Sequence, residues 1–346
     1  MSAPLHHVII GSGSAGFGAA TTLRQNDDDC RITMITMDSL PFYNRYDLPQ
    51  VFRGQQDWRE LLDVPPAYYD DMRIDLRRRS RVVDVDGSNR LVSLAHQENV
   101  AYDRLLVCAG GRGYLPENLT GYAGLMHGFG SFEAAMRLYR DLPKGGTAII
   151  IGGDMIGIDL AMTLLDTGYD VSLIATPQTF WPHELSNDER RALFAALRAS
   201  GMTVHEDHRP VGVSGGVSGN NAGKAPRCVT LDDGTEVTGD VVLPFCGLTS
   251  SVEFMLKAEV DIERGLLVTP QLRTSNKTIW AAGDVCQIWQ DQDKAYHFYH
   301  GWKNVRVMGE LAARNMSGAQ EIFDTAVEDR IWIDANGQIN STFWIH

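Results

Sequence analysis

The chain has 346 residues, of which 44% are hydrophobic and 22% are charged, and its formal net charge at pH 7 is −13. This composition is typical of a globular protein of one or two domains, and its acidity disfavours nucleic acid and anionic membranes as partners. The five cysteines are widely spaced and include no C-x-x-C pair, which excludes a local redox disulfide and gives no zinc pattern. The sequence has neither a signal-peptide pattern nor an uninterrupted apolar span, so we expect a cytoplasmic protein without membrane insertion.

A strand, a glycine-rich loop, a helix and a second strand open the chain. Residues 5–10 are apolar, the loop GSGSAG occupies 11–16, a helical pattern continues to Gln25, and a second apolar run occupies 31–36. This order predicts a β–loop–α–β unit with its glycines at the first turn.

The loop has the spacing G-x-G-x-x-G. Gly11 allows a tight turn, Gly13 a close approach of the backbone to a pyrophosphate, and Gly16 close packing of the helix against the strand. The N–H groups and the dipole of the following helix favour bound phosphate. Asp38 follows the second strand at the distance expected of a carboxylate that binds a ribose diol. The first unit therefore predicts a dinucleotide site.

The segment after the first unit carries a basic cluster and two further strand patterns. The sequence RVVDVDGSNRLVSL predicts a hairpin, and YDRLLVCAGG predicts a buried strand that ends in two glycines. The basic cluster fits a solvated face or a docking patch for an acidic protein or a phosphate. Its members are Arg73, Arg77, Arg78, Arg79 and Arg81.

Residues 145–175 repeat the layout of the first unit, about 140 residues further along the chain. An apolar strand leads into the loop GGDMIGID, a helix and a second strand, which predicts a second nucleotide-binding fold. Later, TIWAAGD at 278–284 predicts a strand ending in Gly-Asp, and a helix is expected at 302–316. His297 and His300 are close in sequence, but no adjacent cysteine or carboxylate completes a ligand set, so we predict no metal.

With both units present, the chain resembles the flavoprotein reductases that have two dinucleotide-binding domains, and is most similar to the rubredoxin- and flavorubredoxin-reductase type. Five stretches between residue 8 and about residue 318 carry the resemblance: VIIGSGSAGFGAA, ITMITMDSLPFYNRYDLPQV, YDRLLVCAGG, TSNKTIWAAGDV and GWKNVRVMGELAARNMSG. The resemblance implies an α/β fold of two Rossmann-like, three-layer ββα domains with a shortened C-terminal segment. The implied domains are FAD-binding at 1–114 and 245–317, NAD(P)-binding-like at 115–244, and a truncated interface segment at 318–346.

The resemblance also implies FAD in the first domain. The positions implied for the pyrophosphate are Gly11, Ser12, Gly13, Ser14, Ala15 and Gly16, with Asp38 on the adenosine ribose. Further cofactor-binding positions are Val82, Ala109, Gly110, Gly283 and Asp284, the last on the ribityl or pyrophosphate region. Arg45, Asp159 and Trp302 are implied beside the flavin, as candidates for flavin-based catalysis. By residue type alone, Arg45 fits a surface position equally well, and Trp302 fits the core.

The second loop departs from the family pattern G-G-G-x-x-G-x-E. Asp154 replaces a glycine, Asp159 stands for the glutamate, and residues 175–177 after the next strand carry no charge to select NADH or NADPH. A carboxylate about 4 Å from a phosphate charge costs about 4 kcal/mol at an effective dielectric near 20. That cost is about half of the binding free energy of a micromolar complex, which is roughly 8 kcal/mol.

Two interpretations of this degenerate second site stay open. Either NAD(P)H still binds over the flavin, as the resemblance implies, or it binds weakly or not at all and a protein partner exchanges the electrons. Asp154 itself could rotate away or cap its own helix, where aspartate is favoured. The residues of the site are Gly152, Gly153, Asp154 and Gly157.

We therefore expect an FAD-dependent oxidoreductase. It passes electrons directly through the flavin, between NAD(P)H or a protein donor and a small redox protein or redox enzyme. The alternative is an electron-transfer subunit of a larger redox complex that does not itself use NAD(P)H; a homodimer is also compatible with the sequence. The aromatic end STFWIH predicts an exposed contact surface for a partner.

Overall fold

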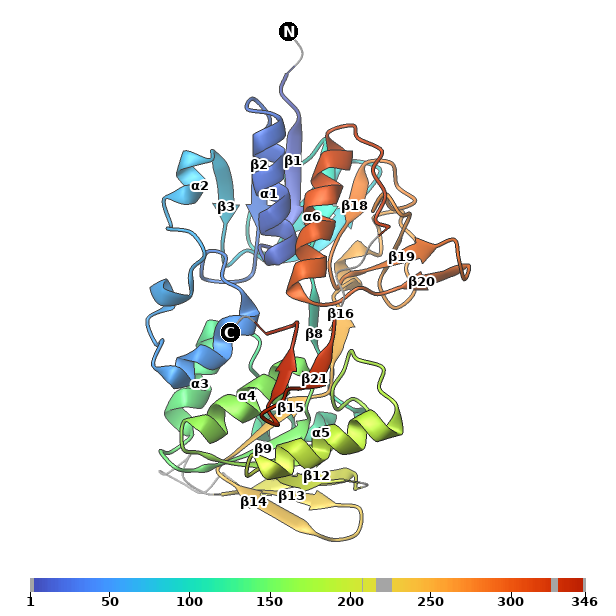
Figure 1. Cartoon of the computed structure of the whole chain (residues 1–346). Coiled ribbons are helices and arrows are strands. Elements are labelled where there is room, and N and C mark those ends of the chain that lie inside the picture. Colours follow the sequence, from blue (N-terminus) through green and yellow to red (C-terminus); the bar gives the residue numbers. More distant parts are fainter. Residues whose placement is uncertain (1–2, 207, 216–225, 325–328, 345–346) are drawn as a thin grey trace. The chain divides into compact units, whose positions relative to one another are not determined.

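The computed structural model describes residues 3–206, 208–215, 226–324 and 329–344. The chain divides into two compact units (Figure 1). Unit 1 consists of Met1–Asn44, Leu62–Arg112 and Thr249–Val327. Unit 2 consists of Arg45–Leu61, Gly113–Leu248 and Glu328–His346. Two of the boundaries between the units lie within β8 (Gly111–Gly113) and β16 (Leu248–Ser250).

A five-stranded parallel sheet with the order β18-β7-β1-β2-β3 forms the centre of unit 1. Its strands are β1 (His6–Ile10), β2 (Arg31–Ile35), β3 (Ile74–Arg77), β7 (Arg104–Val107) and β18 (Ile279–Ala281). Most of their side chains are buried and apolar, as expected for parallel strands that are covered on both faces. The predicted β–loop–α–β unit is confirmed, because β1 and β2 are adjacent in the sheet.

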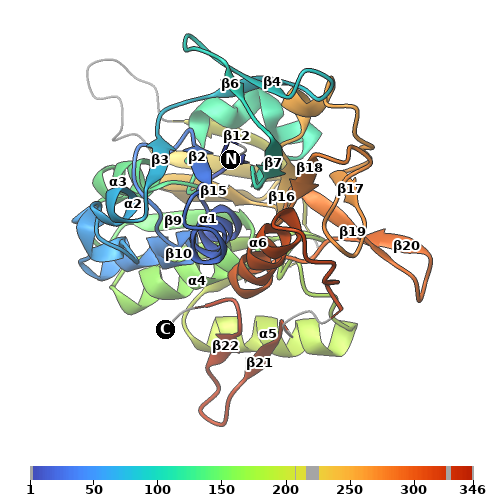
Figure 2. The same cartoon turned by 90° about the horizontal axis from the view of Figure 1, so that it is seen from above.

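Helices α1 (Ser14–Asn26) and α6 (Trp302–Met316) lie side by side in unit 1 (Figures 1 and 2). Gly309 permits their close approach, because a Cβ atom there would lie only 2.0 Å from the carbonyl oxygen of Ala15. The other elements of unit 1 are α2 (Tyr68–Asp71), β4 (Val82–Asp86), β5 (Leu91–Leu94), β6 (Val100–Ala101), η5 (Glu253–Met255), β17 (Leu266–Val268), β19 (Cys286–Gln290) and β20 (Ala295–His297). Apolar residues of all of these elements except β20 join a core cluster with the sheet.

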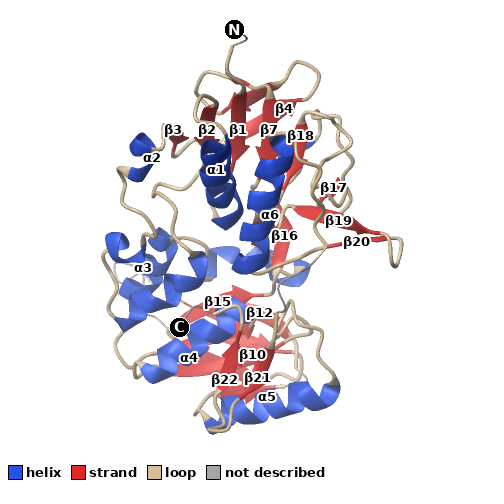
Figure 3. Ribbon diagram, turned by 45° about the horizontal axis from the view of Figure 1, so that its top comes forward, coloured by secondary structure: helices blue, strands red, loops and turns tan. Residues whose placement is uncertain are grey.

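Unit 2 has three layers. A four-stranded parallel sheet with the order β11-β10-β9-β15 contains β9 (Thr147–Gly152), β10 (Asp170–Ala175), β11 (Thr203–His205) and β15 (Val241–Phe245). An antiparallel sheet of β12 (Pro210–Gly215), β13 (Arg227–Leu231) and β14 (Glu236–Gly239) shares a core with it. The predicted α/β class with parallel sheets is confirmed (Figure 3).

The helices of unit 2 are α3 (Phe132–Asp141), α4 (Met155–Asp166), α5 (Asn187–Ala199), η1 (Arg45–Arg53), η2 (Trp58–Leu61) and η3 (Glu117–Leu125). Helix α5 begins with a capping box, in which Ser186 and Glu189 satisfy each other's backbone N–H groups. None of the helices in the described residues is both long and apolar enough to span a membrane.

The C-terminal residues form the hairpin of β21 (Ile331–Ile333) and β22 (Ile339–Ser341) in unit 2, beside α5. Phe343 follows this hairpin and is only 1% exposed, with its ring against that of His183. Trp344 is half-buried, and residues 345–346 lie outside the described residues. The prediction of an exposed aromatic end is therefore wrong for Phe343, because the hairpin folds its side chain into the unit's own core.

Candidate functional site

The first glycine loop connects β1 to α1, and its three motif glycines have different surroundings. A Cβ atom at Gly11 (φ +105°) would lie 2.0 Å from the carbonyl oxygen of Cys108, and one at Gly16 would lie 2.0 Å from that of Gly11. At Gly13, no atom of the described residues would come within 4 Å of an added Cβ. The loop therefore packs tightly against the end of β7 and presents the backbone of Gly13 to open space.

Helix α1 begins without a side-chain cap. Gly13 is its N-cap residue, and no capping side chain from the described residues bonds to its first turn, which Ser14, Ala15 and Gly16 form. The N–H groups of a first turn need acceptors, and with the helix dipole they attract anions. This start of α1 fits a diphosphate group held by backbone N–H groups.

Two distant strand ends meet the first loop. After β7, Gly110 adopts a positive φ of 64°, next to Ala109. After β18, a Cβ atom at Gly283 would lie 3.4 Å from Cβ of Ala15 and 3.6 Å from Cβ of Val305 in α6. The glycine loop and the Ala-Gly-Asp strand end thus lie together at the carboxyl edge of the sheet, where open α/β sheets bind ligands.

Asp38 follows β2 at the same edge of the sheet. One of its carboxylate oxygens accepts a hydrogen bond from the N–H of Leu40 at 3.1 Å, and the other accepts one from the hydroxyl of Tyr43 at 3.1 Å. These bonds fix the orientation of a partly exposed carboxylate. Val82 opens β4, is half-buried and packs against the core of unit 1.

The start of α6 is a second uncapped helix start. Its N-cap residue is Gly301, with φ 90° and no capping side chain from the described residues. The indole Nε1 of Trp302 is buried there and has no hydrogen-bond partner among the described residues. A buried indole N–H usually finds an acceptor, so Trp302 fits a position beside a bound ligand.

Each of the two histidines near this helix contacts a carboxylate. His300 Nδ1 lies 2.7 Å from Asp284 Oδ1, and His297 is hydrogen-bonded to Asp293. Each pair offers two ligands and neither belongs to the group of three that could hold a metal among the described residues, so the absence of a metal at these histidines stays a prediction. Folding brings Asp284 to His300 from 16 residues away, and the turn between β19 and β20 brings Asp293 to His297.

The three residues predicted beside the flavin are divided between the units. Trp302 belongs to unit 1, whereas Arg45, the first residue of η1, and Asp159, in α4, belong to unit 2. Asp159 is buried at 4% exposure. A shared role of these three residues stays a prediction.

The second glycine loop connects β9 to α4 and is also tightly packed. A Cβ atom at Gly152 (φ +89°) would lie 2.3 Å from the carbonyl oxygen of Phe245, and one at Gly157 would lie 2.6 Å from the Phe245 ring. Gly153 also has a positive φ of 93°. Gly152 and Gly157 are therefore required for the close packing of the loop and α4 against the end of β15, with or without a nucleotide.

Asp154 caps the helix that follows this loop. One oxygen of its carboxylate accepts a hydrogen bond from the N–H of Gly157 at 3.0 Å, and the other accepts one from the N–H of Gly247 at 3.2 Å. The residue is 7% exposed, and burial raises the pKa of its carboxyl to about 6. Of the conformations expected for Asp154, the structure has the one in which the side chain caps its own helix.

Other groups of unit 2 complete the closure of the second loop. Met155 donates its N–H to the carbonyl oxygen of Trp181 at 3.1 Å, and its own carbonyl oxygen accepts from the indole N–H of Trp344 at 2.9 Å. The Trp181 ring lies against Gly247, where an added Cβ would come within 3.1 Å of it. The start of α4 is therefore occupied by the chain's own side chains.

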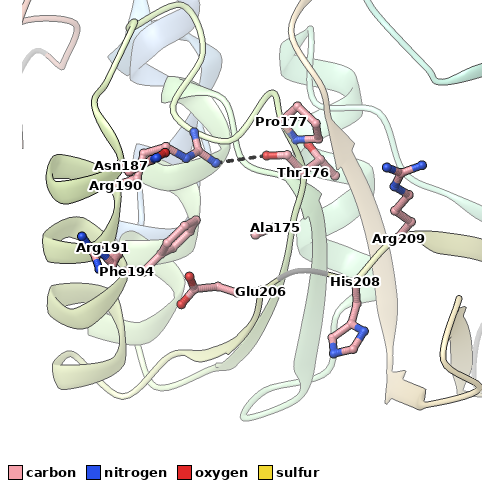
Figure 4. Close-up of a pocket in the computed structure, with 10 residues that line it drawn as sticks. All are labelled: Ala175, Thr176, Pro177, Asn187, Arg190, Arg191, Phe194, Glu206, His208 and Arg209. Carbon is pink, nitrogen blue, oxygen red and sulfur yellow. Dashed lines mark hydrogen bonds between the residues drawn. The ribbon is translucent and has the colours of Figure 1, made fainter.

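A pocket of about 720 Å³ lies between α5 and the ends of β10 and β11 (Figure 4). Arg190 donates to the carbonyl oxygens of Thr176 at 3.3 Å and Thr179 at 2.8 Å, and Arg191 pairs with Asp188. The lining residues are Ala175, Thr176, Pro177, Asn187, Arg190, Arg191, Phe194, Glu206, His208 and Arg209. Three arginines thus surround a strand end whose own residues are uncharged.

These arginines are not evident from the uncharged residues directly after β10, on which the sequence prediction of the nucleotide preference rests. The available signal was the pair Arg190-Arg191 just after the capping box of α5, since the first turns of that helix lie beside the strand end.

One group among the described residues could offer three ligands to a metal ion: His208, Asp232 and Asp233, whose ligand atoms lie within 4.8 Å of one another. Both carboxylates already have local roles. Asp232 accepts from the N–H of Arg209 and Asp233 from the N–H of Thr235, which shapes the turn between β13 and β14.

Comparisons with known proteins agree with this geometry. The chain is 27% identical to the nitric oxide reductase FlRd-NAD(+) reductase of Aliivibrio fischeri, covering 83% of this chain and 73% of that protein. It is 25% identical to the rubredoxin-NAD(+) reductase of Pseudomonas putida, covering 80% and 71%. The fold matches putidaredoxin reductase in its covalent complex with putidaredoxin, with a TM-score of 0.84, 20% identity, and coverage of 96% and 79%.

A family model, described as pyridine nucleotide-disulphide oxidoreductase, matches residues 5–308. FAD and NAD(P)H are the cofactors of this family. The match covers most of the chain and includes both glycine loops and both strand ends described above. The chain therefore belongs to the pyridine nucleotide-disulphide oxidoreductases and is an oxidoreductase of the flavoprotein type.

Proposed function

We propose that this chain is an FAD-dependent reductase that passes electrons between NAD(P)H or a protein donor and a small redox protein or redox enzyme. The observation that carries the proposal is the carboxyl edge of the first sheet. There, Gly283 lies between Ala15 of α1 and Val305 of α6, and both helices begin with an uncapped glycine. Helix starts that lack a side-chain cap from their N-cap residue, as these two do among the described residues, suit the pyrophosphate and the electron-rich ring of a flavin nucleotide.

In this proposal, each part of FAD has its own residues. The first turn of α1 would bind the pyrophosphate, Asp38 the adenosine ribose and Asp284 the ribityl chain. The start of α6 and the buried Nε1 of Trp302 would face the flavin ring. Bound FAD supplies the capacity to accept an electron pair and release single electrons, while the chain binds, orients and shields it.

Transfer would occur without a redox disulfide. All five cysteines are free, and four of them are buried. Burial raises the pKa of the Cys108 and Cys286 thiols, and it raises that of Cys246 to about 12. Because the thiolate is the reactive form of cysteine, these residues are poor candidates for thiol chemistry at neutral pH. The names of the relatives, which include rubredoxin-NAD(+) reductase, support a small redox protein as the partner.

The identity of the donor depends on unit 2, where two observations oppose each other. The arginines around the end of β10 favour NADPH over NADH, because cations at this position suit a ribose 2′-phosphate. Asp154 disfavours both nucleotides, because its carboxylate occupies the start of α4. The repulsion between this carboxylate and a phosphate charge costs about 4 kcal/mol, and the binding free energy of a micromolar complex is about 8 kcal/mol. We therefore expect dissociation constants close to millimolar for both nucleotides.

The second candidate function is an electron-transfer subunit of a larger redox complex that does not itself use NAD(P)H. Two features favour this candidate specifically. One is the self-capped start of α4, and the other is the seal that Trp181 and Trp344 form there through their hydrogen bonds to Met155. Under this candidate, a protein would donate the electrons and unit 2 would serve as a scaffold.

Reconstitution and dye reduction test both candidates. The purified chain is expected to bind one FAD and turn yellow, and failure to bind FAD would overturn the whole proposal. With FAD bound, anaerobic dye reduction is measured over increasing NADPH and NADH. Turnover that saturates near millimolar NADPH supports the reductase, whereas no turnover with either nucleotide supports the subunit.

A further inference from the structure

We propose that His300 is a positioning residue for the flavin nucleotide, and that its Nδ1–H holds the Asp284 carboxylate in the orientation that binds a ribityl hydroxyl. This inference rests on the proposed function, because it requires FAD at the carboxyl edge of the first sheet.

The contact between the two side chains is short and sheltered. His300 Nδ1 lies 2.7 Å from Asp284 Oδ1, and the two side chains are 13% and 25% exposed. Since a carboxylate only accepts hydrogen bonds, the histidine must carry its proton on Nδ1. A hydrogen bond to a charged acceptor in such a site is about twice as strong as a neutral one.

His300 is itself held in place from two sides. Its ring stacks on that of Phe298, with centroids 5.4 Å apart and planes 16° apart. Its carbonyl oxygen accepts a hydrogen bond from the side chain of Asn304 at 2.9 Å, and Asn304 is only 2% exposed. The imidazole is therefore fixed before any ligand arrives.

The carboxylate is fixed in the same way. Ser250 donates its hydroxyl to the backbone carbonyl oxygen of Asp284 at 2.8 Å, which anchors the strand end. The bond from His300 engages Oδ1 and sets the rotation of the carboxylate, and in this proposal Oδ2 would accept a hydrogen bond from a ligand hydroxyl. Preorganisation of this kind lowers the entropy cost of binding.

The chain offers a matched control in the same segment. His297 is also hydrogen-bonded to a carboxylate, that of Asp293, but these side chains are 42% and 52% exposed. Exposed pairs contribute little, because water and salt screen them. His297→Leu therefore removes a histidine–carboxylate pair without removing the support of Asp284.

The experiment measures the dissociation constant of FAD, by its fluorescence, for the apoprotein and four variants of the full chain. His300→Leu removes the donor. His300→Asn keeps a donor where Nδ1 lies, whereas His300→Gln keeps one only where Nε2 lies. Loss of one charge-assisted hydrogen bond predicts a dissociation constant about tenfold or more above wild type for His300→Leu and His300→Gln. His300→Asn and His297→Leu should stay within about twofold of the wild type.

The two amides distinguish a hydrogen-bonding role from a packing role. If His300 acted only by packing, Gln should replace it better than Asn, because Gln matches the length of histidine better. The hydrogen-bonding role predicts tighter FAD binding by His300→Asn than by His300→Gln. Equal binding by His300→Asn and His300→Gln, or wild-type binding by His300→Leu, would overturn the inference while FAD binding by the wild type upholds the proposed function. A wild type that binds no FAD overturns both. Circular dichroism of each apoprotein confirms that the variants compared are folded.

Discussion

The helix starts of α1 and α4 have the same position in their folds and opposite surroundings. Both follow a parallel strand and a glycine loop whose tight turn packs against a neighbouring strand. Helix α1 begins at Gly13 with open space in front of its backbone, whereas α4 begins at Asp154, whose carboxylate bonds the N–H groups of Gly157 and Gly247. The comparison indicates that the glycines of such a loop are needed for the packing of the fold, whereas the residue at the N-cap decides whether the helix start can bind an anion.

The largest expected effect comes from giving the first loop the residue of the second. Gly13→Asp should abolish FAD binding at micromolar concentrations, because a carboxylate near the pyrophosphate costs about 4 kcal/mol, or about a thousandfold. Gly13 has φ −73°, which other residues adopt freely, and open space for a side chain, so the fold itself should survive. FAD fluorescence titration of the apoprotein measures the loss.

Gly13→Asn is the matched control, with nearly the same shape and no charge. It should retain clearly more affinity for FAD than Gly13→Asp does. Equal affinities in the two variants would show that charge at the helix start does not decide binding.

The next effect is a dependence of stability on pH. Burial raises the pKa of Asp154 to about 6 from 3.8, so the folded chain binds this proton more tightly than the unfolded chain does. The resulting stabilisation is fully present below about pH 4 and is lost as the pH rises through about 6. A shift of about two units corresponds to about 3 kcal/mol. Asp154→Ser keeps a capping oxygen but does not titrate in this range.

Thermal unfolding of the wild type and of Asp154→Ser, measured from pH 4 to pH 7.5, checks this prediction. The melting temperature of the wild type relative to the variant should fall by several degrees across this range. A constant difference between the two proteins would mean that Asp154 titrates normally.

A smaller effect is expected from the reverse exchange in the second loop. Asp154→Gly should tighten NADPH binding by about 10- to 100-fold, because it removes the repulsion of about 4 kcal/mol. The bond from the Met155 N–H to the carbonyl oxygen of Trp181 offsets part of the gain, because it occupies an N–H group of the helix start. Isothermal titration of the FAD-loaded variant measures it.

Asp154→Asn removes the charge but keeps a side chain of the same size at the start of α4. It should therefore tighten binding less than Asp154→Gly does. If neither variant binds NADPH better than the wild type, then the seal by Trp181 and Trp344, and not the carboxylate, excludes the nucleotide.

The smallest effect concerns that seal. Trp344→Phe keeps an aromatic ring but removes the N–H that bonds the carbonyl oxygen of Met155, so it should destabilise unit 2 by about 1 kcal/mol. Trp332→Phe alters an exposed tryptophan of the same hairpin segment and is the control. The free energies of unfolding of the two variants, taken from chemical unfolding curves, should differ by this amount, and the flavin absorbance should be unchanged. Coincident curves would show that the bond does not stabilise the unit.

Local patterns in the sequence predicted the elements that lie close together along the chain. The run 5–36 predicted β1, α1 and β2, because apolar strands, the glycine spacing and the helical period are all local signals. The Gly-Asp strand end at 283–284 was also visible as a pattern.

Contacts between distant residues could not be predicted in this way. Asp154 reaches the N–H of Gly247 across 93 residues, and Trp344 reaches Met155 across 189. The arginines of α5 lie beside the end of β10 only once helix and strand have packed. The burial of Phe343 likewise depends on where the hairpin packs. The aromatic segment STFWIH by itself fits a buried position and a surface contact equally well.

The most direct test of the contrast between the two helix starts is an anaerobic titration of the FAD-loaded chain with NADPH and NADH, followed by the flavin absorption band. With α1 open and α4 self-capped, FAD should stay bound throughout, and the band should bleach only as either nucleotide approaches millimolar concentration. Complete bleaching at micromolar nucleotide would contradict this account, because the Asp154 carboxylate would then not be keeping a dinucleotide from unit 2.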